Sequence, residues 1–245
     1  MRIYAHPIIG MAGLLAFSAP AAAQDSEPFE VPGEQQVGTR FLQEPETVEQ
    51  GRARDMQKRI AHCAYRKNRA EIAKLLAHSN FYQIDYAAIG MDSKKMWEDF
   101  GMGQCLGRVM RGDEFKMYMS YNDSTIRNLF AEEAYLRDGN GPLTIAADAP
   151  ERLSQRYGAD KFHPQIAVMS NLADCIVHKD AANAHALLAS DPGSDAEKSV
   201  VATLSPTIVA CMKSKKDEVS VSNSLIRQLV ADGLWSRSYY GRAAE

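Results

Sequence analysis

Two parts of the 245-residue chain repeat each other, and this repetition constrains the fold more than any other feature of the sequence. Residues 60–77 and 172–189 align without a gap, and seven of their 18 positions are identical. Further along, residues 124–131 and 224–231 share five of eight positions. Similar stretches that return in the same order predict two structural units of similar build.

The first 23 residues predict export. Arg2 precedes an apolar run over residues 8–17, and three alanines at 21–23 provide a cleavage site before Gln24, which is the pattern of a secretory signal peptide. The apolar run is about half the roughly 20 residues that span a bilayer, so we expect no transmembrane segment once the signal is removed. Export of this kind places the chain in the periplasm or outside the cell.

All four cysteines occupy equivalent positions in the two copies. In an oxidising compartment they are expected to form two disulfides, and four cysteines allow three pairings. The repeat selects the pairing within each copy, which is Cys63–Cys105 and Cys175–Cys211. Each bridge would close a loop of roughly 40 residues and contribute about 4 kcal/mol of stability. A zinc site is disfavoured, because the close cysteine spacing of such sites is absent.

Composition and charge favour an ordinary globular domain and exclude some partners. Apolar residues make up 45% of the chain and charged residues 24%. The net charge of −3 gives no electrostatic reason to expect a nucleic acid or an anionic membrane as partner. No motif for a nucleotide, a haem or a catalytic metal is present, so no cofactor is expected.

Apolar residues recur at helical spacing through both copies, and residues that alternate at 115–121 and 219–221 predict two short strands. The predicted fold is mainly α, with two tandem helix–helix–(short strand)–helix repeats that each contain one internal disulfide. The expected helices cover residues 52–77, from about 92 to 105, 124–137, 165–189, 194–212 and 224–235. The expected boundaries are a signal peptide at 1–23, a flexible leader at 24–51, a first half at 52–138, a linker at 139–164, a second half at 165–237 and a tail at 238–245.

The cysteine segments and the closing helices together carry a family resemblance. Their features are Ala61-His62-Cys63 with Leu75-Leu76, Asp174-Cys175 with Leu187-Leu188, the downstream cysteines, and the two Ser-x-Ile-Arg-x-Leu-x-Ala stretches. This pattern resembles uncharacterised secreted proteins of alphaproteobacteria and covers most of the chain after the signal peptide. The resemblance implies export, a repeat and a helical fold, and it implies no activity.

Arg127 and Arg227 are charged and yet identical in the two copies, three residues after Ser124 and Ser224. One interpretation is an anion site at the beginning of a helix. The other is a structural arginine whose guanidinium joins carbonyl groups or a carboxylate between helices. Their presence in two copies whose surfaces otherwise differ favours the structural interpretation.

Asp174, His178 and His185 are expected on one face of the helix over 165–189. Asp174 and His178 are four residues apart and could share a metal ion or act as an acid–base pair. His185 is two helical turns beyond His178, too far to join the same metal. Because the first copy has different residues at these positions, we expect a solvated polar stripe and no metal site.

The sequence contains no recognisable catalytic set, so no catalytic residue is assigned. The leading hypothesis is a non-enzymatic periplasmic or secreted module that binds an envelope protein or another periplasmic component through its helical surfaces. The alternative is an envelope enzyme, such as a hydrolase, whose site leaves no local motif. A groove is expected first near residues 81–121, which are rich in aromatic residues and methionines.

Overall fold

The structure is a computed structural model, and it describes residues 49–111, 121–139, 141–146, 148–157, 164–212 and 221–242. Residues 47–245 form one compact unit. The predicted signal peptide and nearly all of the predicted leader lie outside the described residues, as do the predicted strands except for Tyr121 and Val221, which are not in strands.

The described residues are mainly helical, as predicted. The helices are α1 (Gln50–Lys67), α2 (Arg69–Ala77), α3 (Tyr86–Ile89), α4 (Met96–Asp99), α5 (Met102–Val109), α6 (Asp123–Asp138), α7 (Pro164–Lys179), α8 (Ala181–Ala189), α9 (Asp195–Met212) and α10 (Asn223–Arg242). One isolated bridge, Ser79 with Ile84, is the only strand-like pairing in the described part of the chain.

Both predicted disulfides are confirmed. Cys63–Cys105 joins α1 to α5, and Cys175–Cys211 joins α7 to α9. Each half therefore links its first helix to a later one in the same way. Whether the two halves superpose as structural repeats stays a prediction.

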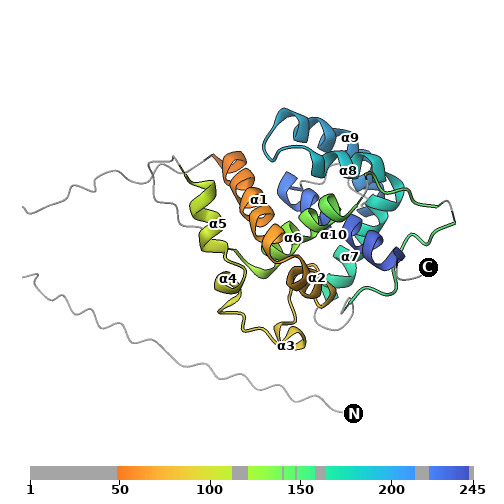
Figure 1. Ribbon diagram of the computed structural model, residues 1–245. Helices are drawn as coiled ribbons and strands as arrows, with labels where there is room; N and C mark the ends of the chain where they lie inside the picture. Colours follow the sequence, from red (N-terminus) through yellow and green to blue (C-terminus); the bar gives the residue numbers. More distant parts are fainter. Residues whose placement is uncertain are drawn as a thin grey trace, which may run out of the picture. The chain divides into compact units, whose positions relative to one another are not determined.

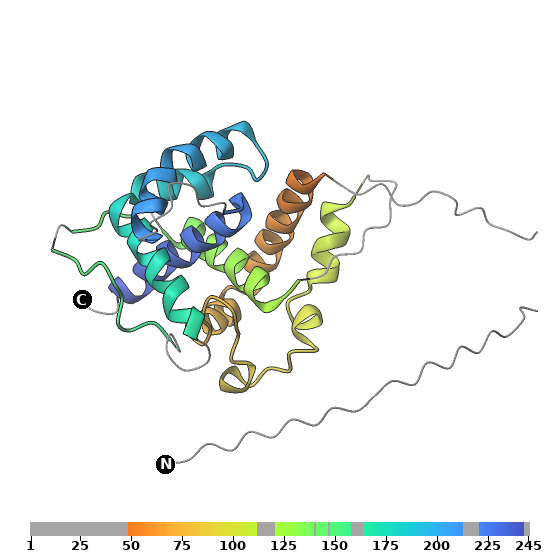
Figure 2. The same cartoon turned by 180° about the vertical axis from the view of Figure 1, so that it is seen from behind.

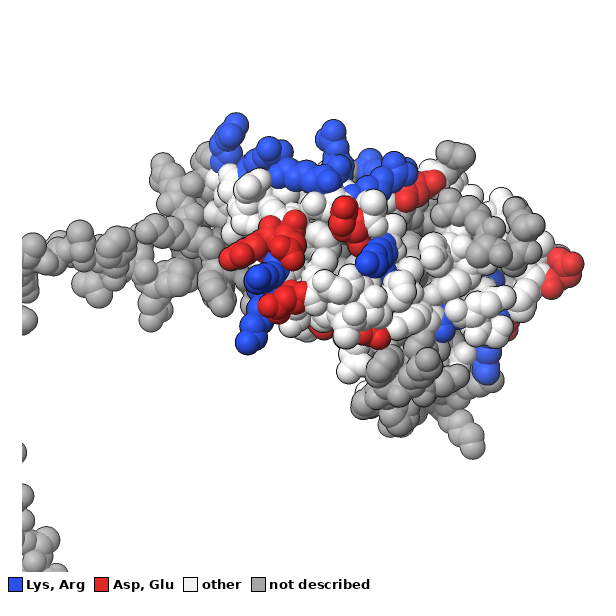
Figure 3. Space-filling view, turned by 60° about the horizontal axis from the view of Figure 1, so that its bottom comes forward, with Lys and Arg blue, Asp and Glu red and all other residues white. Residues whose placement is uncertain are grey.

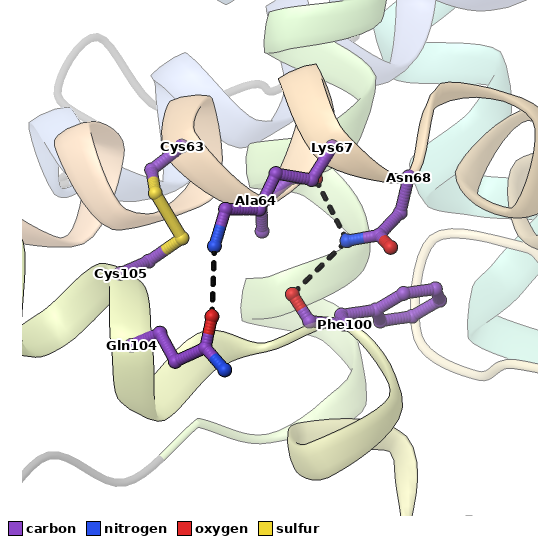
Figure 4. Close-up of a disulfide and its surroundings, with 7 residues drawn as sticks. All are labelled: Cys63, Ala64, Lys67, Asn68, Phe100, Gln104 and Cys105. Carbon is purple, nitrogen blue, oxygen red and sulfur yellow. Dashed lines mark hydrogen bonds between the residues drawn. A yellow bond between two sulfur atoms is a disulfide. The ribbon is translucent and has the colours of Figure 1, made fainter.

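The prediction of one long helix at the start of each half is wrong, because each of these helices is interrupted once. The first break is Asn68, whose side-chain amide donates to the carbonyls of Ala64 and Phe100, at 3.0 Å in both cases (Figure 4). The second break is Asp180, whose carboxylate accepts the N–H of Asn183 at 3.1 Å and caps α8. Asn and Asp compete with the helix by bonding nearby backbone groups, which explains a turn at each position.

Three other boundaries also differ from the prediction. The helix expected from about residue 92 is divided into α4 and α5 at Gly101, whose φ of 60° a helix cannot continue through. The last helix extends to Arg242, beyond the end that was expected at about residue 235. The linker is also more than a connection, because the side chain of its Arg156 is buried in the core.

Helices α6 and α10 pack against each other at the centre of the compact unit, as both views in Figures 1 and 2 show. Helices α1, α2 and α5 lie on one side of this pair, and α7, α8 and α9 lie on the other (Figures 1 and 2). Fully buried apolar side chains of this central pair, including Ile126, Phe130 and Leu229, belong to the hydrophobic core. No helix in the described ranges is long and apolar enough to span a bilayer.

Candidate functional site

The structure places Asp174 in the interior, so the predicted solvated polar stripe is wrong. Only 1% of Asp174 is exposed. Its carboxylate pairs with Arg156 and accepts the N–H of Leu153 at 2.9 Å. Both partners belong to the segment before α7, and helical periodicity alone could not show that this segment covers the face of α7.

The break at Asp180 separates the other two residues of the predicted stripe. His178 is half-buried at the end of α7, whereas His185 lies on α8 with its Nδ1 3.0 Å from the hydroxyl of Tyr135. Asp174 and His178 therefore remain as neighbours on one helix, and His185 belongs to a different contact. Within the described ranges, no group of three or more His, Cys, Asp or Glu side chains could hold a metal ion.

Arg127 is buried in α6 with only 1% of its surface exposed. Its guanidinium pairs with Asp232 of α10 and donates through Nε to the hydroxyl of Ser79 at 3.2 Å. The guanidinium also lies over the ring of Trp235, 5.0 Å from its centroid, a cation–π geometry.

Arg227 is buried in α10 and has more partners. Its Nε and Nη2 donate to the two carboxylate oxygens of Glu132 at 2.9 and 2.7 Å, a bidentate pair. Its Nη1 donates to Glu197 at 3.2 Å. Three carbonyl groups at the end of α8 accept its remaining hydrogens: Leu187, Leu188 and Ser190. The guanidinium therefore joins α6, α8, α9 and α10.

The two arginines form reciprocal pairs across the centre of the molecule. The alignment that matches Arg127 with Arg227 also matches Glu132 with Asp232, each 100 residues apart. Arg127 of α6 pairs with Asp232 of α10, and Arg227 of α10 pairs with Glu132 of α6. Crossed pairs of this kind require α6 and α10 to run antiparallel. All four groups are buried, so they are not open to a solvent anion.

The buried acids differ in their pKa because their cationic neighbours differ. Burial opposes the charged form of Asp232, but Arg156 and Arg127 outweigh burial and lower its pKa. Burial is likewise outweighed at Glu197, where hydrogen bonds from Arg54 contribute most to a lowered pKa. At Asp174 burial prevails over the attraction of Arg156, and the pKa is raised.

A cleft of about 580 Å³ opens between α1, α5 and α6. Six basic side chains line the cleft: Lys58, Arg59, Arg66, Lys67, Arg108 and Arg137. Three acids face them, Asp55, Glu133 and Asp191. The chain as a whole has a net charge of −3, so the cleft is a local concentration of positive charge. Figure 3 shows Lys and Arg side chains gathered along one edge of the molecule, at the top of the view.

Some of these cations are already engaged and others are not. Lys58 pairs with the buried Glu132 at 3.0 Å, and Lys67 donates to Gln104 at 3.1 Å (Figure 4). Arg66 and Arg108 are exposed, and neither has a hydrogen-bond or ion-pair partner among the residues described. In the described part of the chain, these two arginines are therefore exposed cations without a partner.

His62 and Glu133 form a pair at the wall of the cleft. The Nδ1 of His62 lies 2.7 Å from Oε2 of Glu133, which also receives Nε of Arg137 at 3.5 Å. Glu133 is only 1% exposed, and its second oxygen, Oε1, has no hydrogen-bond partner in the described structure. Leaving a buried carboxylate oxygen without a donor is costly, and this oxygen has almost no solvent-accessible surface of its own.

A smaller pocket of about 280 Å³ lies beside α3 and the beginning of α6. Its two carboxylates accept hydrogen bonds from tyrosines of the chain, Asp85 from Tyr157 at 2.8 Å and Asp123 from Tyr86 at 2.9 Å. This pocket includes residues 83–86, in the region where a groove was expected, whereas the larger cleft takes only Arg108 and Val109 from it. The groove expectation therefore pointed to the lesser of the two sites.

Comparisons of the chain with protein-family models, with curated proteins and with solved structures found no match. The functional argument therefore depends on the geometry and charge of the cleft.

Proposed function

We propose that this protein is an exported, non-enzymatic binding module that takes an anionic component of the cell envelope into the basic cleft. The observation that carries this proposal is a pair of exposed arginines, Arg66 and Arg108, that have no partner among the described residues. They lie in a cleft with twice as many basic as acidic side chains. Two disulfides are compatible with an oxidising compartment, and the predicted signal peptide favours the periplasm or the exterior. The resemblance to secreted alphaproteobacterial proteins is part of this proposal.

Binding of long polyanions tests this function directly. Fluorescently labelled polyphosphate and poly-glutamate should bind the oxidised chain with micromolar affinity, and binding should weaken as salt is raised because exposed charges are screened. The double variant Arg66→Glu/Arg108→Glu should bind at least about tenfold more weakly, equivalent to 1.4 kcal/mol or more.

The matched control is Lys179→Glu, an equal change of charge per site on the exposed end of α7. This variant should bind like the parent. If neither polyanion binds the parent, or if Lys179→Glu weakens binding as much as the double variant, the basic cleft is not the binding site.

A second candidate function is hydrolysis, because His62 is oriented by a buried carboxylate in the way that a general base is. It replaces Asp174 and His178 as the acid–base candidate, since Asp174 is held by Arg156. A screen of phosphoester and carboxylester substrates should detect turnover that His62→Ala abolishes. Turnover of this kind would contradict the non-enzymatic proposal.

A further inference from the structure

In the second half of the protein, a segment of the chain itself, residues 148–157, is bound against α7 and α10. The segment 148–157 has no regular secondary structure and passes the C-terminal end of α10 on its way to α7, as both views in Figures 1 and 2 show. The N–H of Leu153 donates to Asp174, and the guanidinium of Arg237 donates to the carbonyls of Pro150, at 3.1 Å, and Glu151. The backbone of this segment therefore both donates and accepts hydrogen bonds that hold it against the helices.

One side chain of the segment also enters the interior. Arg156 pairs with Asp174 of α7 and Asp232 of α10, and its side chain is almost completely buried. The N–H of the next residue, Tyr157, donates to the hydroxyl of Tyr240 at 3.0 Å. Residues 148–157 are therefore held by hydrogen bonds to their backbone and by one buried side chain.

The residues that hold this segment have counterparts in the first half. Alignment of residues 60–77 with 172–189 matches Asp174 with His62. The alignment of the closing helices, extended along α6 and α10, matches Arg237 with Arg137. His62 and Arg137 both line the basic cleft. Within the described ranges, the equivalent place is filled by the chain's own backbone in the second half and is part of the basic cleft in the first.

The charges at the two places are opposite. In the second half, Asp174 and Asp232 form ion pairs with Arg156 of the segment. In the first half, Glu132 already forms ion pairs with Arg227 and Lys58. The first-half cleft has six basic and three acidic side chains, and its exposed Arg66 and Arg108 have no partner among the described residues. A segment that complements this charge carries acidic side chains.

We propose that the basic cleft binds a peptide segment of a partner protein, irregular in conformation and rich in acidic side chains, in the place that residues 148–157 occupy in the second half. This inference rests on the proposed function and specifies its ligand. Arg137 donates to peptide carbonyls as Arg237 does, since its side chain is 54% exposed and only its Nε contacts Glu133. Arg66 and Arg108 form ion pairs with the acidic side chains of the peptide.

The probe is a labelled ten-residue peptide with the sequence of residues 148–157, in which Arg152→Glu and Arg156→Glu reverse its two cations. The control peptide keeps both arginines. Fluorescence anisotropy with the full oxidised chain should show micromolar binding of the acidic peptide, and the control peptide should bind at least about tenfold more weakly.

Three variants of the protein complete the experiment. Arg137→Ala should weaken binding of the acidic peptide at least about fivefold, and Arg66→Glu/Arg108→Glu should weaken it at least about tenfold, while Lys179→Glu should bind like the parent. Thermal melting of each variant verifies that it is folded. Equal binding by the parent, Arg137→Ala and the double variant would overturn the inference.

Polyphosphate distinguishes this inference from the proposed function. If polyphosphate binds in a way that needs Arg66 and Arg108 while the acidic peptide does not bind, the peptide inference is wrong and the anion-binding function stands. If neither binds, both are wrong. If the acidic peptide binds, needs Arg137 and competes with polyphosphate, both are supported.

Discussion

Arg227 has the most hydrogen-bond acceptors of any buried group described above, and its removal tests the structural interpretation at the scale of one residue. Arg227→Ala would leave Glu132 and Glu197 short of a cation and three carbonyls without a donor. Breaking a buried ion pair by removing one partner costs about 3–5 kcal/mol. We expect thermal unfolding of the oxidised variant to begin roughly 10 °C lower than in the parent.

Arg127→Ala should be destabilised less, because Asp232 keeps a second cation in Arg156. The control is Arg152→Ala, which removes an exposed arginine and should melt like the parent. If Arg227→Ala also melts like the parent, Arg227 does not hold the fold and the anion-site interpretation returns.

Repetition determined which residues could be found from the sequence. The cysteines and arginines were visible because they occur in both halves, and Glu132 with Asp232 could have been found by extending the same alignment by one position. Glu133 and Arg156 have no like residue in the other half, since the counterpart of Glu133 is Gly233. Their roles depend on contacts far apart in the chain, and no local pattern indicates such contacts.

At the scale of elements, Gly233 explains why α7 and α10 lie closer together than a side chain would permit. A Cβ at this position would lie 2.7 Å from the carbonyl oxygen of Ala173. Gly233→Ala should therefore force the two helices apart and cost about 1–3 kcal/mol. The loss can be measured as a lower midpoint of urea unfolding.

Gly107→Ala is the matched control, because Gly107 lies in α5 and a Cβ there would meet nothing within 4 Å. In a helix interior this change should stabilise by up to about 1 kcal/mol. If Gly233→Ala shifts the midpoint in the same direction as Gly107→Ala, the close approach of α7 and α10 is not present in solution.

Helix positions followed from apolar periodicity, whereas helix ends did not. The breaks at Asn68 and Asp180 occupy aligned positions, 112 residues apart, so the repeat contained a signal for them. The apolar spacing continues through both positions, so a prediction from periodicity alone could not place the two breaks. The route of residues 148–157 could not be predicted at all, since it depends on buried pairs with helices that follow later in the chain.

At the scale of the whole molecule, buried ion pairs join the two halves and make stability depend on pH. Arg54 of α1 reaches Glu197 of α9 at 2.8 Å, and the pKa values of Glu197 and Asp232 are both lowered in the folded state. Their contribution to stability is present above the unfolded pKa values of about 4 and is lost as pH falls through the lower folded values. Asp174 acts in the opposite sense, because its pKa is raised.

We therefore expect the melting temperature to fall steeply between about pH 4 and pH 2. Glu197→Gln should melt at a lower temperature at pH 7 and should lose less on acidification, because the group that titrates is gone. Thermal unfolding followed by circular dichroism across this range measures both effects. An equal acid loss in the parent and in Glu197→Gln would show that Glu197 is not paired in the folded protein.

We infer that the basic cleft of the first half binds the kind of segment that residues 148–157 provide in the second half. Photo-crosslinking tests that claim most directly. The acidic peptide should carry a benzophenone group at the position of Leu153, and the crosslinked residues should be mapped by mass spectrometry. The account predicts crosslinks to α1, α5 and α6 around His62 and Arg137 that are suppressed by excess unlabelled peptide. Crosslinks confined to α7 and α10, or spread evenly over the surface, would contradict it.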